Sequence, residues 1–379
     1  MQVGETIYLD YQASTPMDER VLQAMQRASA TLFANPHSAD HVLGWRASAA
    51  IETAALQVSN LFGFQQDDVI FTSGASEANA MAIRTAETSA RVSERTDIFV
   101  GAADHGSILN EATHCSLNVQ KIPLDASGAP DSRRLDEMIS DVTALVSIIG
   151  VNNENGAIAD LKEIAAICRS NGALFHVDLA QAPLAMDVDL LELGVDLATV
   201  SAHKIYGPKG IGALLTGPVV SDLVKPVIVG AGQQAGRRGG TMPTELIVGF
   251  GEASRLVAEA GQYERDRVAA IRDRFVAILQ IKQIANLIGS RNGRHPGNAL
   301  LRFPGQDASE LLGRMQPRIA ASTQSACSSG TIEPSHVLLA MGYDKQIASE
   351  CVRFSFGRFS TIEQAETAAT ILEETLETT

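Results

Sequence analysis

Long apolar runs are missing from this 379-residue sequence. No stretch of about 18 uninterrupted apolar residues occurs, which argues against a membrane-spanning helix. Residues 1–9 also lack a basic region followed by an apolar one, so no secretory signal peptide is predicted. We therefore expect a cytoplasmic protein with no membrane partner.

Positive charge is scarce as well. The sequence has 30 Lys and Arg against 44 Asp and Glu, a formal net charge of −14. Nonspecific attraction to nucleic acid is therefore unfavourable, although a local basic patch is not excluded. We expect no direct nucleic-acid partner.

Cysteine is sparse and unpaired. The four cysteines are Cys115, Cys168, Cys327 and Cys351, and none belongs to a CxxC pair. This excludes a disulfide framework and a four-cysteine zinc site, so we predict reduced thiols and no metal centre.

What the sequence does have is a series of short apolar runs alternating with helical patterns. This alternation is typical of an α/β fold with a mostly parallel central sheet, and continuous apolar runs indicate strands buried on both faces. The predicted strands are residues 69–74, 97–103, 144–150, 174–180, 197–202 and 211–217, with helices over 76–91 and 160–170.

After about residue 244 the pattern changes to long, charged, Ala-rich helical stretches with short mixed elements. We predict a large domain over residues 15–258 and a smaller α+β domain made of residues 1–14 and 259–379. The Gly-rich stretch 230–241 is by composition a surface loop, with a phosphate or subunit contact as the alternative.

Three predicted strand ends carry side chains that suit one ligand. Lys204 and Asp178 each end or follow an apolar strand, where an uncompensated charge is costly. Each has an ordinary alternative: Lys204 as a solvated lysine at a strand end, and Asp178 as a helix cap. Ser76 stands where a third strand turns into a helix, whose free N–H groups suit a phosphate. Because ligands of open α/β sheets bind at the carboxyl ends of strands, the combination predicts pyridoxal 5′-phosphate (PLP).

Four further residues are candidates. His105 and Asn153 follow other strands, where they are more often structural, but an imidazole can also stack on a cofactor ring. Cys327 lies among small polar residues, as expected for a reactive thiol. Arg353 alternates with apolar residues and either meets a surface carboxylate or clamps that of a substrate.

Taken together, these motifs resemble the NifS/IscS-type cysteine desulfurases, in the class V aminotransferase-like group of fold type I PLP enzymes. The similarity covers nearly the whole chain. It rests on YLDYQASTP (8–16), NPHS (35–38), TSGASE, VNNENG, HVDLAQ, SAHKIYGPKG, the Cys327 segment and VRFSFGRFST (352–361).

The resemblance implies a role for each matching residue. Lys204 would bind PLP covalently, Asp178 would pair with its ring nitrogen, and His105 would stack on the ring and manage the substrate thiol proton. Arg353 and Asn35 would bind the substrate carboxylate. Further cofactor contacts would come from Ala75, Ser76, Asn153, Gln181, Ser201, His203 and, across a homodimer interface, Thr241. Asn153 would also bind the substrate.

The implied reaction converts L-cysteine to L-alanine. Cys327 would take the sulfur as a persulfide and pass it to an acceptor protein. Residues 233–238, QQAGRR, lack the acidic–arginine pair common before the phosphate-loop Thr, so the dimer contact there is expected to differ.

Alternatives remain at this point. Selenocysteine lyase and aminotransferase reactions use the same fold, and a regulatory subunit could keep it without catalysis. Iron–sulfur cluster assembly, tRNA thiolation, thiocofactor synthesis and DNA phosphorothioation are all open as destinations of the sulfur.

Overall fold

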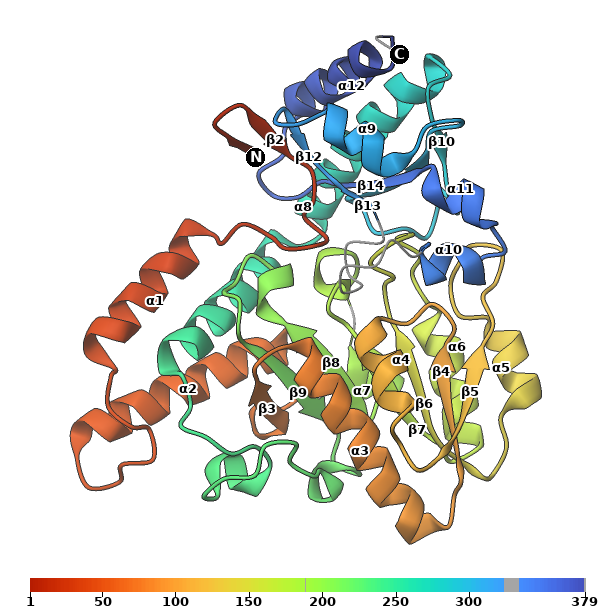
Figure 1. Cartoon of the computed structure of the whole chain (residues 1–379). Helices are drawn as coiled ribbons and strands as arrows, with labels where there is room; N and C mark the ends of the chain where they lie inside the picture. The colour runs from red at the N-terminus through yellow and green to blue at the C-terminus, as the bar shows by residue number, and fades with distance from the viewer. Residues whose placement is uncertain (188, 324–333, 378–379) are drawn as a thin grey trace.

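The computed structural model describes residues 1–187, 189–323 and 334–377. Two large hydrophobic cores organise this part of the chain. One surrounds a seven-stranded sheet, and the other lies between two small sheets and the helices beside them. Figure 1 shows the large sheet in the lower part of the molecule and the small sheets above it.

The large sheet has the strand order β3-β9-β8-β7-β6-β4-β5. The run from β8 to β5 is parallel, whereas β9 is antiparallel to both of its neighbours. The strands are β3 (Val69–Thr72), β4 (Asp97–Gly101), β5 (Asn118–Ile122), β6 (Thr143–Ile149), β7 (Leu174–Asp178), β8 (Leu197–Ser201) and β9 (Gly212–Thr216). The predicted α/β fold with a mostly parallel sheet is therefore confirmed.

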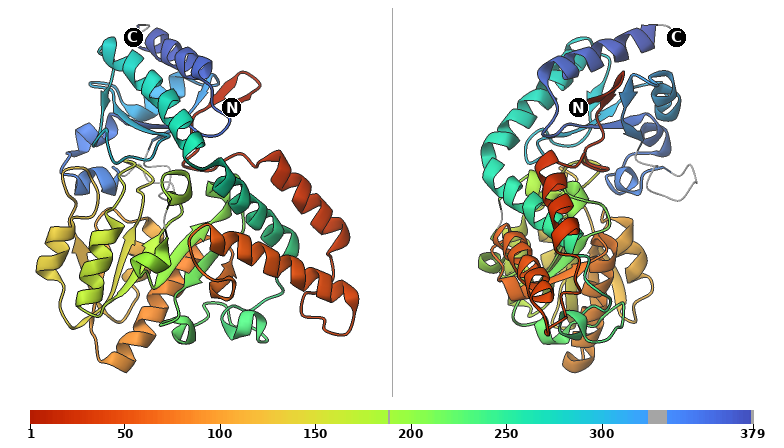
Figure 2. Two further views of the ribbon diagram at one scale, coloured as in Figure 1. Left: turned by 180° about the vertical axis from the view of Figure 1, so that it is seen from behind. Right: turned by 90° about the vertical axis from the view of Figure 1, so that its left-hand side faces the viewer.

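Helices cover both faces of this sheet, which explains why its central strands are continuously apolar. All seven residues of β6 are buried. Helices α3 and α4 lie over one face (Figure 1), and α6 and α7 lie over the other (Figure 2). The helices of this part are α1 (Glu19–Thr31), α2 (Val42–Asn60), α3 (Ala75–Ser93), α4 (Gly106–Ala112), α5 (Ser132–Met138), α6 (Leu161–Ser170) and α7 (Leu190–Leu193).

The second core contains two small sheets. Their orders are β1-β2-β12 and β10-β11-β14-β13, so the N-terminus pairs with a segment more than 300 residues later in the sequence. The strands are β1 (Gln2–Val3), β2 (Thr6–Tyr8), β10 (Asn286–Leu287), β11 (Asn298–Arg302), β12 (Ile319–Ala320), β13 (Ser322–Thr323) and β14 (Cys351–Ser355). The helices are α8 (Thr244–Ile281), α9 (Ala308–Arg314), α10 (His336–Ala340), α11 (Lys345–Ser349) and α12 (Ile362–Glu377).

Helix α8 connects the two cores. It is interrupted at Gly261, whose φ of 49° and ψ of −147° are not helical. Its first half packs into the large-sheet core and its second half into the small-sheet core. On this basis we propose the domain limits that the sequence predicted: a large domain over residues 15–258 and a smaller one made of residues 1–14 and 259–379. Five short 3-10 helices complete the described chain: η1 (Gln66–Asp68), η2 (Ala182–Leu184), η3 (Ala202–Lys204), η4 (Ser221–Leu223) and η5 (Gln233–Gly236).

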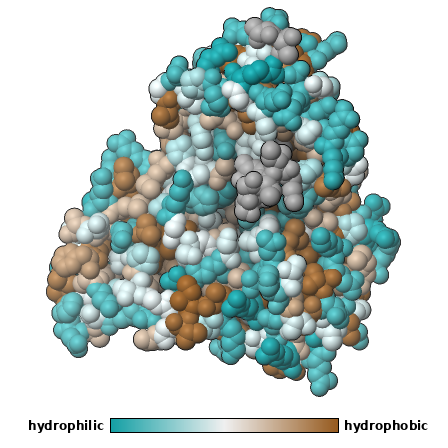
Figure 3. All heavy atoms as spheres, in the orientation of Figure 1, coloured by the Kyte–Doolittle hydropathy of each residue, from teal (hydrophilic) through white to brown (hydrophobic). Residues whose placement is uncertain are grey.

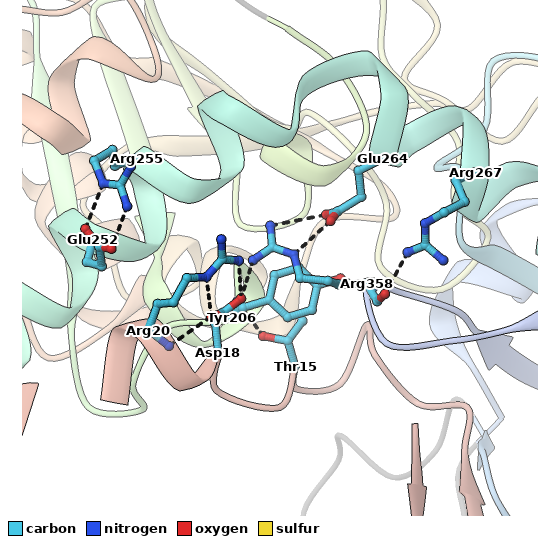
Figure 4. Close-up of polar contacts among 9 residues, drawn as sticks. All are labelled: Thr15, Asp18, Arg20, Tyr206, Glu252, Arg255, Glu264, Arg267 and Arg358. Carbon is cyan, nitrogen blue, oxygen red and sulfur yellow. Dashed lines mark hydrogen bonds and ion pairs between the residues drawn. The ribbon is translucent and has the colours of Figure 1, made fainter. Parts of the chain in front are cut away.

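Arg358 holds the junction beside this interruption (Figure 4). Its guanidinium donates to Asp18, the N-cap of α1, at 2.9 Å and to Glu264 on α8 at 2.8 Å. Its Cζ atom also lies 4.3 Å from the centroid of the Tyr206 ring. One buried arginine thus joins α1, α8 and the segment after η3.

Within residues 1–187, 189–323 and 334–377, no helix combines the length and apolar character that crossing a bilayer requires.

Candidate active site

A cavity of about 650 Å³ lies at the carboxyl ends of the central parallel strands. Strands β6, β7 and β8, the start of α3, the N-terminal segment and β14 all contribute to its wall. The predicted site residues that line it are Ala75, Ser76, His105, Asn153, Asp178, Gln181, Ser201, His203, Lys204 and Arg353. The fold therefore brings residues from distant parts of the sequence to one place.

Asp178 is the last residue of β7 and is only 2% exposed. Its Oδ1 accepts a hydrogen bond from the Ala180 backbone N–H at 2.9 Å, and its Oδ2 accepts one from Asn79 Nδ2 at 2.8 Å. It forms no salt bridge with any residue in the described ranges. A buried carboxylate held in this way suits a cationic ligand group such as a protonated pyridine ring.

Lys204 ends the 3-10 turn η3, directly after β8. Its Nζ donates to the backbone oxygens of Gln12 at 2.6 Å and Ala13 at 2.9 Å. The N-terminal segment, which the small-sheet core anchors through β2, thus lies against this amine. The contact keeps Nζ at the cavity wall, where an aldehyde could react with it.

His105 is the N-cap of α4, and its Nδ1 accepts a hydrogen bond from the Ser107 N–H at 3.1 Å. Burial lowers the pKa of His105 below its usual value, and the nearby Asp178 carboxylate opposes that shift. The imidazole is therefore favoured in its neutral form, as stacking on an electron-poor ring requires.

The first turn of α3 forms the part of the cavity suited to a phosphate. Gly74, with φ of +154°, is the N-cap, so the turn begins one residue before Ser76 and Ser76 itself is not the cap. A Cβ on Gly212 of β9 would lie 2.8 Å from the Gly74 Cα, which shows how closely the two backbones approach. The exposed N–H groups of this 19-residue helix favour an anion.

His203 lies on the same side of the cavity. Its Nδ1 is 3.3 Å from the Ser14 hydroxyl. Burial, together with Lys204 and Lys209, lowers the pKa of His203 to about 4, so its ring is neutral at physiological pH.

Arg353 reaches the cavity from β14, on the small-sheet side. It is 3% exposed, and its Nη2 donates to Asp10 Oδ1 at 2.7 Å. Its Nη1 donates to the Asn153 backbone oxygen, also at 2.7 Å. The guanidinium is thus held in place at the small-sheet side of the cavity.

Two predicted residues of the described chain do not line this cavity, and a third lies outside the described residues. Asn35 is exposed, and its Oδ1 accepts from the His37 N–H at 3.0 Å. Thr241 is also exposed and does not line the cavity. Cys327 lies outside the described residues.

An arginine of the loop before Thr241 pairs with an acidic residue that lies outside the loop. Arg238 donates to Glu77 on α3, with a nearest N–O distance of 2.9 Å. The Glu77 carboxylate also accepts from the Ser73 N–H at 2.7 Å. This ion pair ties the Gly-rich loop to the first turn of α3.

Sequence reasoning missed three residues of the site. Gln12 lines the cavity, and its backbone oxygen accepts a hydrogen bond from the Lys204 amine. Asn79 donates to Asp178, and the Ser107 hydroxyl contacts His105 Nδ1. For Asn79 a signal was available, because a polar residue three positions after Ser76 lies on the same helix face. Gln12 interacts mainly through its backbone oxygen, which no side-chain pattern could reveal.

Comparison with known proteins agrees with the geometry. The model of the aminotransferase class-V family matches residues 7–367. The chain is 38% identical to a protein named cysteine desulfurase IscS from Rickettsia massiliae (strain Mtu5), over 97% of this chain and 90% of the relative.

Two solved structures are similar throughout. A NifS-like protein superposes with a TM-score of 0.91 at 29% identity, over 99% of this chain and 100% of that one. The structure of SspA in complex with cysteine has a TM-score of 0.80 at 30% identity, over 94% of this chain and 100% of that one.

The chain belongs to the aminotransferase class-V family, whose cofactor is PLP. Within that family its relatives are the NifS/IscS-type cysteine desulfurases, so the resemblance seen in the sequence is confirmed.

Proposed function

We propose that this chain takes sulfur from L-cysteine, releases L-alanine, and carries the sulfur on Cys327 as a persulfide for an acceptor protein. The general activity is that of a PLP-dependent cysteine desulfurase. The observation that carries the proposal is that Lys204, Asp178 and Arg353 line one cavity, each from a different element.

The residues present fit PLP. Lys204 would hold its aldehyde carbon, Asp178 its ring nitrogen, and His105 the face of the ring. The phosphate would lie at Ala75, Ser76, Ser201 and His203, with Gln181 and Asn153 as further polar contacts. When bound, PLP supplies an electron sink for the carbanion that forms at the substrate Cα.

The chain's own groups have separate tasks. Arg353 would bind the carboxylate of L-cysteine and orient the substrate, because a planar guanidinium matches a carboxylate in a bidentate way. The Lys204 amine would remove the Cα proton. The Cys327 thiolate would attack the substrate sulfur, so that an S–S bond forms and the Cβ–S bond breaks with its electron pair left on the substrate. Protonation of that carbon gives alanine.

The other cysteines support the choice of Cys327. Cys115, Cys168 and Cys351 do not line the cavity. Burial raises the pKa of all three thiols, that of Cys351 to about 12, which disfavours the reactive thiolate.

A homodimer is part of the proposal. Several large apolar side chains near Asn35 and the Gly-rich loop are exposed in the single chain, among them Phe33 at 74%, Trp45 at 57% and Val229 at 82%. Figure 3 shows apolar side chains among hydrophilic ones on one face of the molecule. A partner subunit that covers them would allow Thr241 to reach the partner's phosphate site. Sedimentation of the purified protein should give twice the chain mass.

The acceptor is proposed only as a protein. The net charge of −14 disfavours direct transfer to nucleic acid, so tRNA thiolation or DNA phosphorothioation would each need an intermediary.

Activity is tested with L-cysteine and a reductant. The PLP-loaded protein should form alanine and sulfide, Cys327→Ser should form neither, and Cys115→Ser should match the parent. An inactive parent would contradict desulfuration and favour a regulatory role. Equal activity of Cys327→Ser would show that this thiol is not the sulfur acceptor.

A further inference from the structure

A continuous chain of hydrogen bonds runs beneath the cavity from His105 to Asp178. His105 Nδ1 lies 2.8 Å from the Ser107 hydroxyl. Asn79 Nδ2 lies 2.9 Å from the same hydroxyl and 2.8 Å from Asp178 Oδ2. Two cavity residues, the N-cap of α4 and the last residue of β7, are thus linked through one helix residue, Asn79 of α3.

The Asn79 side-chain amide can have only one orientation here. If it were reversed, its carbonyl oxygen would face the Asp178 carboxylate and repel it. In the observed orientation both amide hydrogens are used, and Oδ1 is buried with no hydrogen-bond partner among the described residues. An unsatisfied buried acceptor is costly, and the hydrogen bond from Nδ2 to the Asp178 side chain offsets that cost.

The proton position on His105 follows from its own partners. A backbone N–H can only donate, so the Ser107 N–H requires a lone pair on Nδ1. The Ser107 hydroxyl accepts from Asn79 and can therefore turn its hydrogen to the same Nδ1 atom. The proton of the neutral ring must then be on Nε2.

The titratable groups around the imidazole agree with this assignment. Those acting on His105 are the Asp178 carboxylate, the Lys204 amine and His336, whose ring lies on α10 and contacts the Asp104 backbone oxygen at 2.9 Å. Asp178 is the only anion among them, and Asn79 already donates to it.

We propose that Asn79 and Ser107 are positioning residues that fix His105 as a hydrogen-bond donor at Nε2 and hold Asp178 as an acceptor toward the cavity. In terms of the proposed function, on which this consequence rests, His105 donates to the substrate or cofactor and does not serve as the base for the substrate thiol.

The first test needs neither cofactor nor substrate. Nitrogen-15 NMR of the histidine rings in the PLP-free protein, assigned with His105→Gln, should show an unprotonated Nδ1 and a protonated Nε2 for His105. A protonated Nδ1 at neutral pH overturns the proposal. Because this measurement is independent of activity, it stands even if the protein fails to act on cysteine.

The second test separates positioning by Asn79 from a general structural role. Removing a donor to a charged group should lower kcat in Asn79→Ala by about 10-fold to 100-fold, with KM nearly unchanged. Asn79→Asp should be slower still near neutral pH, because its carboxylate repels Asp178. Its kcat should rise as pH falls, since the protonated carboxyl can donate to Asp178 again.

The control is Thr85→Val, which removes a fully buried hydroxyl from the same helix far from the cavity. It should keep the parent pH profile. The positioning role of Asn79 is overturned if the Ala and Asp variants have equal kcat at every pH, or if both match the parent. Thermal unfolding of each variant identifies any that fail to fold, and in that case the NMR result decides.

Discussion

The buried Arg353 forms an ion pair with the partly buried Asp10 at the edge of the cavity, with Nη2 and Oδ1 2.7 Å apart. Asp10 belongs to the N-terminal segment, and Arg353 lies on β14, so the pair depends on both ends of the chain. The backbone oxygen of Asn153 holds the second Nη atom. The guanidinium is consequently oriented before any substrate arrives, which lowers the entropy cost of binding a carboxylate.

We expect Arg353→Lys to raise KM for L-cysteine about 10-fold to 100-fold, because an ammonium cannot make the bidentate contact. The effect on kcat should be smaller. Steady-state kinetics measure both values. The control is Arg302→Lys on β11, a small-sheet strand. It alters the ion pair between Arg302 and Glu350 and should leave KM unchanged. An unchanged KM for Arg353→Lys would exclude it from substrate binding.

Lys204→Ala should abolish covalent retention of PLP. Since the same amine is proposed to move the Cα proton, activity should fall by about 10²-fold to 10⁴-fold. The visible absorbance of the protein after removal of free cofactor measures retention. Lys225→Ala, which changes an exposed lysine, should keep the parent absorbance. Retention of the bound cofactor in Lys204→Ala would mean that another amine holds it.

Arg358→Ala should destabilise the fold strongly. The side chain of Arg358 is 8% exposed, and its removal takes the arginine away from Glu264, whose side chain is 16% exposed, and leaves Asp18 paired with Arg20 alone, at a cost of about 3–5 kcal/mol. Denaturant unfolding measures the loss. Arg20→Ala removes another partner of Asp18, but its side chain is 57% exposed, and a loss of about 1 kcal/mol or less is expected. Equal losses for the two variants would show that burial of Arg358 is not the cause.

Stability should fall as the pH decreases from about 6.5 toward 4. Burial lowers the pKa of His176 to about 4 and that of His295 to about 3. In this range the unfolded chain binds protons that the folded chain cannot. Each histidine therefore lowers the free energy of unfolding by up to about 1.4 kcal/mol per pH unit.

His295→Asn isolates one of these contributions. His295 Nδ1 accepts a hydrogen bond from the Gly297 N–H, with the two nitrogens 3.0 Å apart. The Oδ1 of the new asparagine can accept the same hydrogen bond. The free energy of unfolding of this variant should depend less steeply on pH between 6 and 4 than that of the parent. An identical slope would mean that His295 is not neutral in the folded protein.

Much of the large sheet could be predicted from the sequence, and the exception is informative. Strands β6, β7 and β8 are buried along their length, so their apolar runs stand out. Strand β5 has a single buried residue, Ile122, because it lies at the edge of the sheet. Its polar sequence NVQKI carries no strand signal.

The sequence alone determined the chemical inventory of this protein. A lysine, an aspartate and a helix start at strand ends were readable because parallel strands expose their carboxyl ends at one edge of a sheet. The family followed from the order of these motifs along the chain.

Only the tertiary structure decided how these groups are oriented. The pairing of Arg353 with Asp10, the contact of Lys204 with the Gln12 backbone and the link from Asp178 through Asn79 to His105 all join residues far apart in sequence. Such contacts depend on the packing of the small sheets against the large one and on where each backbone carbonyl and amide points. Local sequence patterns carry no information on either.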